Sequence, residues 1–150
     1  MLSHQIHIIM ERKNYLRQII QSIESNPNSD LIVHLGHFAY DSKNHPALFE
    51  FRAIEILQNL LNCKTHSFHE LILGALCNFS SNKDGHSSID LPLILSQWDS
   101  VSYLGQRSIA CIFYYLNCNL IGLESTDRVT QNILQCITLA NFSNSEGFSK

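Results

Sequence analysis

The stretch Phe68-His-Glu-Leu-Ile-Leu-Gly-Ala-Leu-Cys-Asn-Phe79 gives the strongest indication of the fold of this chain. Its apolar residues recur at the three- and four-residue intervals that place them on one face of an α-helix. They are Phe68, Leu71, Ile72, Ala75, Leu76 and Phe79. Ser67, followed three residues later by Glu70, predicts a capping box at the start of this helix. The stretch therefore predicts one amphipathic helix with a buried face.

The same apolar pattern recurs on both sides of this stretch. It is found upstream at Leu31, Leu35 and Phe38, and downstream at Ile109, Ile112, Phe113 and Leu116. When the ends are aligned, Phe38 and Phe79 lie 41 residues apart, and Phe79 and Leu116 lie 37 residues apart. Both spacings are close to the period of about 40 residues that armadillo and HEAT units have.

A shorter helix is expected before each long one. The three candidates are Tyr15–Glu24, Ala53–Leu61 and Leu91–Trp98, the last with Asp90 as its cap and Trp98 in the core. Polar turn clusters at 41–44 and 80–85 separate the units. After them, 45–49 and 86–89 are long enough for the extra short helix that distinguishes armadillo from HEAT units.

These patterns predict an all-α fold, an armadillo-type α-solenoid of two complete and two partial repeats in a single domain. The expected boundaries are a partial repeat at 12–40, repeats at 43–80 and 83–117, and a C-terminal capping helix at 126–141. Such units do not bury their apolar faces alone, so neighbours must stack into one core.

Composition excludes several functional classes. The 150 residues carry a formal net charge of −3, with Lys and Arg scattered along the chain. This is too little positive charge for autonomous nucleic-acid binding. We find neither a secretory signal nor an apolar run long enough to cross a bilayer. Five cysteines without paired spacing favour a reducing compartment, the nucleus or cytoplasm, over secretion.

Two runs carry a family resemblance: Leu35-Gly-His-Phe-Ala-Tyr-Asp-Ser-Lys-Asn44 and Leu73-Gly-Ala-Leu-Cys-Asn-Phe-Ser80. The chain resembles the armadillo-repeat-containing protein seven family from about Arg12 to Asn117, most specifically at Phe38-Ala-Tyr-Asp41. The resemblance implies a dedicated partnership with an RNA-recognition-motif protein, RNA-binding motif protein forty-eight, in minor-spliceosome pre-mRNA splicing. It also implies a nuclear location, and contact with small nuclear RNA only through that partner.

The expected partner-binding residues are polar or aromatic and lie on the long helices or at the joints between units. They are His34, His37, Tyr40, Asn44, Asn78, Arg107, Tyr114 and Tyr115. Aromatic and Arg side chains are the usual anchors of protein interfaces. Two simpler explanations stay open: turn formation accounts for Asn44, and Tyr114 or Tyr115 packs against the closing helix.

The peptide-gripping ladder of nuclear-import carriers is largely missing. Where those carriers place Asn, this chain has His37, Asn78 and Tyr115, and in place of their Trp it has Val33, Gly74 and Cys111. A dedicated folded partner is therefore expected. The alternative is a general armadillo peptide-binding adaptor unrelated to RNA.

Catalysis, cofactors and metals are not expected. The chain lacks the Gly-x-Ser-x-Gly elbow and the phosphate-binding Gly-rich loop. The best metal clusters, Cys63-x-x-His66-x-x-His69 and His34-x-x-His37, lack the second ligand pair that structural zinc requires. We therefore predict a non-enzymatic scaffold with no small-molecule substrate and no membrane contact.

Overall fold

The computed structural model describes residues 1–63, 67–116 and 131–133, and in this part of the chain every regular element is a helix. In chain order the elements are α1 (Leu2–Ser25), α2 (Ser29–Tyr40), η1 (Ser42–Asn44), α3 (His45–Glu50), α4 (Ala53–Asn62), α5 (His69–Ser80), η2 (Lys83–Ser88), α6 (Leu91–Leu95), η3 (Trp98–Ser100) and α7 (Tyr103–Tyr115). The all-α prediction is confirmed. Of the predicted capping helix at 126–141, only 131–133 are described; they are helical, and Ile133 is buried.

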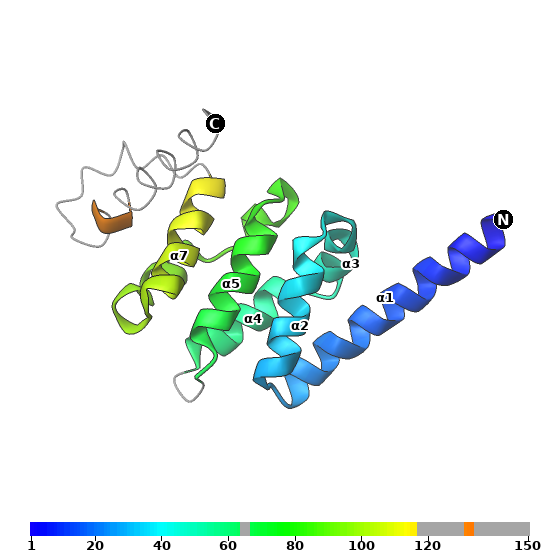
Figure 1. The fold of residues 1–150 in the computed structure, drawn as a ribbon, viewed down its shortest axis with the longest axis horizontal. Helices are drawn as coiled ribbons and strands as arrows, with labels where there is room; N and C mark the ends of the chain where they lie inside the picture. Colours follow the sequence, from blue (N-terminus) through cyan, green and yellow to red (C-terminus); the bar gives the residue numbers. More distant parts are fainter. Residues whose placement is uncertain (64–66, 117–130, 134–150) are drawn as a thin grey trace, which may run out of the picture.

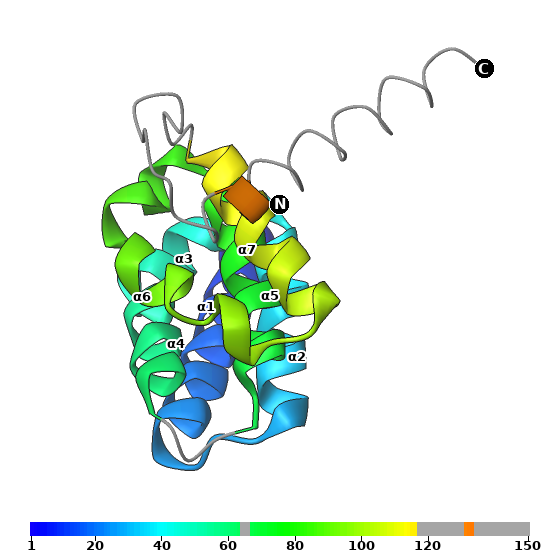
Figure 2. The same ribbon diagram turned by 90° about the vertical axis from the view of Figure 1, so that its left-hand side faces the viewer.

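The helices form two layers. In Figure 1, α2, α5 and α7 lie side by side, and α5 packs against both of the others. Figure 2 shows α3, α4 and α6 in a second layer behind them. The helix α1 packs against α2, α3 and α4 along its C-terminal half, and its N-terminal half projects beyond the body (Figure 1). Among the described helices, none is long and apolar enough to span a membrane.

The core lies between the two layers. Each helix contributes the apolar stripe that its sequence period predicts, including Leu16 and Ile20 of α1, Ile32 of α2 and Leu57 of α4. Phe79 is fully buried and its ring lies 5.6 Å from that of His45 and 5.9 Å from that of Phe49. The prediction that Trp98 packs in the core is confirmed, because only 3% of it is exposed.

The buried face of α5 differs in one position from the prediction. Leu71 is 38% exposed, and Leu73 is fully buried in its place. The reason is that α5 is the central helix of its layer and packs against α2 on one side and α7 on the other, so its buried arc is wider than a single stripe.

The predicted capping box at the start of α5 is wrong. The helix begins at His69 after Phe68, with no side-chain cap. Glu70 instead accepts a hydrogen bond from the backbone N–H of Ser102, at 2.6 Å, and so connects α5 to the start of α7. A hydrogen bond to a residue 32 positions away thus replaces the predicted capping box between Ser67 and Glu70.

Two other helix ends also differ from the prediction. The helix expected at Tyr15–Glu24 begins at Leu2, and α6 ends at Leu95, short of Trp98. The long helix whose apolar pattern begins at Ile109 in the sequence is α7, which starts at Tyr103. The expected cap of α6 is confirmed, because the Asp90 carboxylate accepts from the N–H of Leu93 at 3.1 Å.

One turn geometry occurs twice, 41 residues apart. After α2, the Asp41 side chain accepts from the N–H of Lys43, and after α5 the Asn82 side chain accepts from the N–H of Asp84, each at 3.0 Å. The two buried or half-buried histidines that follow repeat this spacing. His45 bonds the carbonyl oxygen of Ala39, and His86 bonds that of Ser80.

These histidines use their rings to satisfy carbonyl groups at the ends of α2 and α5, where the last turn of a helix leaves its acceptors unpaired. The ring of His45 is also linked to Asn82 at 3.1 Å, which joins the first turn to the second. Side chains of the same kind thus stabilise both turns and connect them.

Candidate partner-binding surface

The predicted site residues divide between two regions of the surface. His34 of α2 lies toward α1, where Tyr15 Oη is 3.3 Å from its Nε2 and the ring of Phe38 lies 5.2 Å from its own. His37 and Tyr40 are exposed farther along α2. The structure therefore places His34 in an aromatic cluster with α1, away from the contacts that α2 makes with α5.

Asn44 is a correction to the predicted contact set. Its side chain is only 2% exposed, and its amide donates to the carbonyl oxygen of Phe38 at 2.9 Å. A residue that is 98% buried and bonded inside the chain offers a partner almost no surface. Turn formation, the simpler explanation that the sequence left open, accounts for Asn44.

Asn78 is half-buried and makes a contact between helices. Its Nδ2 donates from α5 to the carbonyl oxygen of Gly36 on α2, at 3.0 Å. A Cβ built on Gly36 would lie 3.7 Å from Cβ of Ala75, an ordinary van der Waals distance, so the two helices lie close together at this point. The amide of Asn78 is thus bonded to the neighbouring helix.

Residues from α2, α5 and α7 meet on one surface, which we call the three-helix face. Its members are Tyr40, Cys77, Asn78, Arg107, Cys111 and Tyr115. Burial raises the pKa of Tyr115, and the ionisable groups of Cys77, Cys111, Tyr114 and Tyr40 add to the rise. The three helices that carry these residues pack side by side, α5 against both α2 and α7.

Aromatic side chains dominate the exposed part of this face. Tyr40 is 83% exposed at the end of α2. Tyr114 and Tyr115 meet edge to face with ring centroids 5.7 Å apart, and about half of each residue remains exposed. Arg107 is exposed one turn before Cys111 on α7. Aromatic rings and an arginine on a rigid helical surface are the side chains that most often anchor interfaces. Whether the tyrosines also pack against the predicted closing helix concerns residues outside the described ranges.

Sequence reasoning missed a second exposed surface, the apolar side of the projecting half of α1. Leu2, Ile6 and Ile9 follow one another at helical spacing and are between 50% and 76% exposed. The interval of four and then three residues was visible in the sequence and could have identified it. We call this set the α1 tip.

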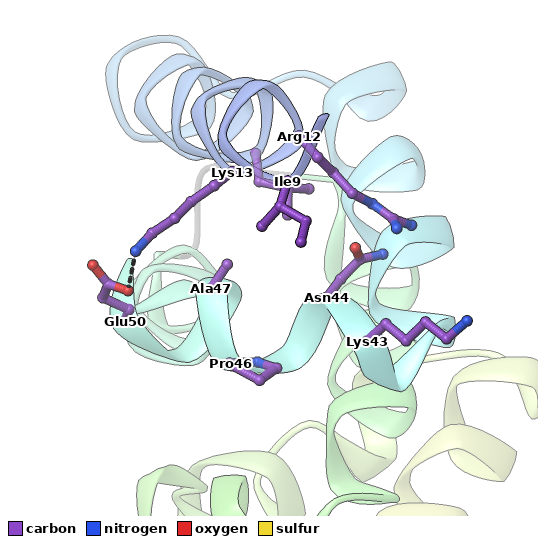
Figure 3. A pocket seen from close by; sticks show the side chains of 9 residues that line it. Ile9, Arg12, Lys13, Lys43, Asn44, Pro46, Ala47 and Glu50 are labelled. Atoms are coloured by element: carbon purple, nitrogen blue, oxygen red, sulfur yellow. Dashed lines mark ion pairs between the residues drawn. The ribbon is translucent and has the colours of Figure 1, made fainter. Parts of the chain in front are cut away.

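A shallow pocket of about 240 Å³ lies where the α1 tip meets α3 (Figure 3). Ile9 points into it, and an ion pair of 2.7 Å between Lys13 and Glu50 closes one side. On the other side Arg12 approaches Asp41 at 3.4 Å. Two ion pairs, Lys13–Glu50 and Arg12–Asp41, thus flank the pocket, and Lys43 also lines it.

Potential metal ligands are scattered along the described residues. Within them, no three His, Cys, Asp or Glu side chains gather closely enough to hold an ion. His66, a member of the best predicted cluster, lies outside the described residues. Its neighbour His69 has Nε2 at 3.4 Å from the carbonyl oxygen of Cys63, an ordinary turn contact.

No protein-family model matches this chain, and a search of curated proteins finds no significant match.

Proposed function

We propose that this protein is a non-catalytic, armadillo-type scaffold whose three-helix face holds an RNA-recognition-motif protein within a splicing-related small nuclear ribonucleoprotein of the minor-spliceosome type. The observation that carries the scaffold role is the three-helix face itself, an aromatic and arginine surface built across α2, α5 and α7. The choice of partner rests on the resemblance of 35–44 and 73–80 to the armadillo-repeat-containing protein seven family.

The repeated turn supports the solenoid architecture. Hydrogen bonds of the same kind follow α2 and α5 at an interval of 41 residues. That interval matches the period of about 40 residues in armadillo units. The short helix α3 after the first turn and η2 within the second correspond to the first helix that armadillo units add to a helical pair.

Two features favour a folded partner over an extended peptide. The amide of Asn78, which a peptide-binding groove would leave available, is bonded to Gly36. The exposed tyrosines lie at the C-terminal ends of α2 and α7, where the surface of a folded partner could pack against them. A peptide-binding adaptor unrelated to RNA is the competing function. Co-purification distinguishes it from the splicing-related scaffold.

The direct test is co-purification with the full chain as bait from cells that express it, followed by identification of the recovered proteins and RNA. Recovery of an RNA-recognition-motif protein together with small nuclear RNA supports the proposal, and nuclear staining of the tagged chain would agree with it. Repeated recovery of other proteins with neither component would refute the splicing role and leave the adaptor.

Matched charge reversals test the face. Arg107→Glu should reduce recovery of the partner at least about tenfold, because an arginine that acts as an interface hot spot contributes about 2 kcal/mol or more. Lys83→Glu, the same kind of reversal at an exposed position of η2, should leave recovery unchanged. An Ile6→Glu/Ile9→Glu variant tests the α1 tip. If only this variant loses the partner, the contact lies on α1 and our assignment of the face is wrong.

RNA should reach the complex through the partner. The purified chain should bind capped RNA weakly, because its net charge is −3 and its cations are dispersed. Tight binding by the chain alone, weakening steeply with salt, would contradict this part of the proposal.

A further inference from the structure

One apolar stripe runs along the whole of α1, but only half of it is covered. Leu16, Ile20 and Ile23 are no more than 3% exposed, in the half that packs against α2, α3 and α4. The same alternation of three and four residues, followed back through Lys13, reaches the three residues of the α1 tip. This alternation is typical of the seam along which one helix packs against another. The seam of α1 is therefore covered by helices at one end and open at the other.

The open part of the seam leads into the pocket between the α1 tip and α3. Ile9 of α1 and Ala47 of α3 point toward each other across it (Figure 3). A volume of about 240 Å³ has room for about one large side chain, since a cavity of about 150 Å³ holds benzene. Beyond it, Ile6 and Leu2 extend the apolar surface. The surface thus offers one concave anchor point followed by two apolar contacts, the arrangement that suits a helix with anchors at i, i+4 and i+7.

The charges around this pocket are predominantly positive. Arg12, Lys13 and Lys43 line it, against the single carboxylate of Glu50. Lys43 is exposed, and no carboxylate of the described residues pairs with it. The side chains of Arg12 and Asp41 are each nearly half exposed, so their ion pair contributes little and can exchange. An acidic ligand would therefore find two cations to pair with, and a basic ligand would be repelled.

Two other occupants match this surface less well. Residues 1–10 contain no Asp or Glu, so two α1 tips packed against each other would bring no carboxylate to Lys43. An anionic bilayer would match the charge, but it is too flat to enter the pocket into which Ile9 points.

We propose that the α1 tip and the pocket beside it form a docking site for an acidic amphipathic helix of a partner protein. One apolar side chain of that helix fills the pocket, and the next two lie against Ile6 and Leu2. Its flanking carboxylates pair with Lys43 and Arg12.

This docking site does not rest on the proposed function. It is built from α1, η1 and α3, whereas the three-helix face is built from α2, α5 and α7. The acidic helix and the partner of the three-helix face therefore bind to different helices, and each can be removed by its own variant.

The experiment is a fluorescence-anisotropy titration of the full chain with two synthetic helices. Each is two heptads long, is stapled on its outer side to keep it helical, and has Leu at both apolar positions of every heptad. One has Glu at the flanking positions and its twin has Lys. We expect the Glu helix to bind at least about tenfold more tightly than the twin, because only the Glu helix is opposite in charge to the pocket rim. Absence of saturable binding by the Glu helix, or equal binding of the two helices, would overturn the proposal.

Variants locate the binding on the chain. Ile6→Glu/Ile9→Glu should abolish binding of the Glu helix, and circular dichroism should show that the fold is kept, since both positions are at least half exposed. Lys43→Glu should weaken the Glu helix and strengthen the Lys twin. Lys83→Glu, the same reversal on η2, should change neither. Binding of the Glu helix that survives Ile6→Glu/Ile9→Glu would show that it docks elsewhere and refute the site.

Two further measurements on the unmodified chain test the competing occupants. Sedimentation equilibrium should show a monomer, and the chain should not float with vesicles of phosphatidylcholine and phosphatidylserine. A dimer that Ile6→Glu/Ile9→Glu dissociates would assign the α1 tip to a second copy. Flotation that the same variant abolishes would assign it to a lipid surface. Either result would overturn the proposal of a partner helix.

Discussion

The side-chain amide of Asn78 on α5 donates to the backbone carbonyl oxygen of Gly36 on α2, at 3.0 Å. This hydrogen bond joins two neighbouring long helices where Gly36 of α2 lies beside Ala75 of α5. Asn78 therefore stabilises the layer of long helices.

Removing this hydrogen bond should be measurable. Asn78→Ala should lower the free energy of unfolding by about 1 kcal/mol, the usual net contribution of such a bond. Asn59→Ala, at an exposed position of α4, is the matched control because both changes raise helix propensity by the same few tenths of a kcal/mol. Urea denaturation of both variants gives the comparison. Equal stability of the two would show that the Asn78–Gly36 bond contributes nothing.

Phe79 should be among the side chains most costly to remove. It is fully buried, and its ring contacts those of His45 and Phe49, which belong to α3. Phe79→Ala should cost about 3 to 5 kcal/mol through lost burial and the cavity left behind. Tyr103→Ala, at a residue that is 71% exposed, should cost far less. A loss below about 1 kcal/mol for Phe79→Ala, measured by urea denaturation, would show that Phe79 does not pack in the core in this way.

Two glycines should respond in opposite directions to the same change. A Cβ on Gly74 would meet nothing within 4 Å, so Gly74→Ala should stabilise α5 by about 0.5 to 1 kcal/mol through helix propensity. A Cβ on Gly85 would lie 3.0 Å from the ring of Phe49 and 3.1 Å from Ile54. Gly85→Ala should therefore destabilise by about 1 to 2 kcal/mol, since the buried neighbours must move. Thermal unfolding of the two variants should show midpoint shifts of opposite sign; shifts of the same sign would refute the prediction.

The sequence predicted which segments are helical better than where the helices end. Apolar periodicity identified the stripes of α2, α4, α5 and α7, because burial of such a stripe is what stabilises a helix in a folded chain. Asp90 was correctly identified as a cap, since capping depends on residues three positions apart. Glu70 was misassigned because Ser102, 32 residues away, competes for its carboxylate.

The candidate site was harder to predict because some of its side chains are also bonded to residues distant in the sequence. Asn44 and Asn78 were selected as polar residues near expected surfaces, and both are bonded to backbone carbonyl groups inside the chain. The exposure of the tyrosines and of Arg107 could be predicted from the helical period alone, and these side chains are accessible in the structure. The packing of α5 against both α2 and α7, on which this surface depends, is not encoded in any local pattern.

The contact between Glu70 and Ser102 should make stability depend on pH. Hydrogen bonds from the Ser102 hydroxyl and backbone N–H hold the pKa of Glu70 below its ordinary value of 4.5. A carboxyl whose pKa is lower in the folded state contributes stability above its unfolded pKa, and this contribution is lost as the pH falls through the folded pKa. Wild type should therefore lose more stability than Glu70→Gln as the pH is lowered below 4.5. Urea midpoints on both sides of this pH, with Glu24→Gln of α1 as the exposed control, measure the difference. Parallel pH profiles for wild type and Glu70→Gln would rule out the contact.

The two halves of α1 should differ sharply when the same residue type is truncated. Ile20 is 3% exposed in the half that packs against the body, and Ile6 is 50% exposed in the half that projects (Figure 1). Ile20→Ala should lower the free energy of unfolding by about 2 to 5 kcal/mol, because it leaves a cavity in the core. Ile6→Ala should change it by no more than about 0.5 kcal/mol, as expected for a surface position. Urea denaturation at two protein concentrations tests both values. A large loss at Ile6 that grows as the protein is diluted would show that the α1 tip packs against a second copy of the chain.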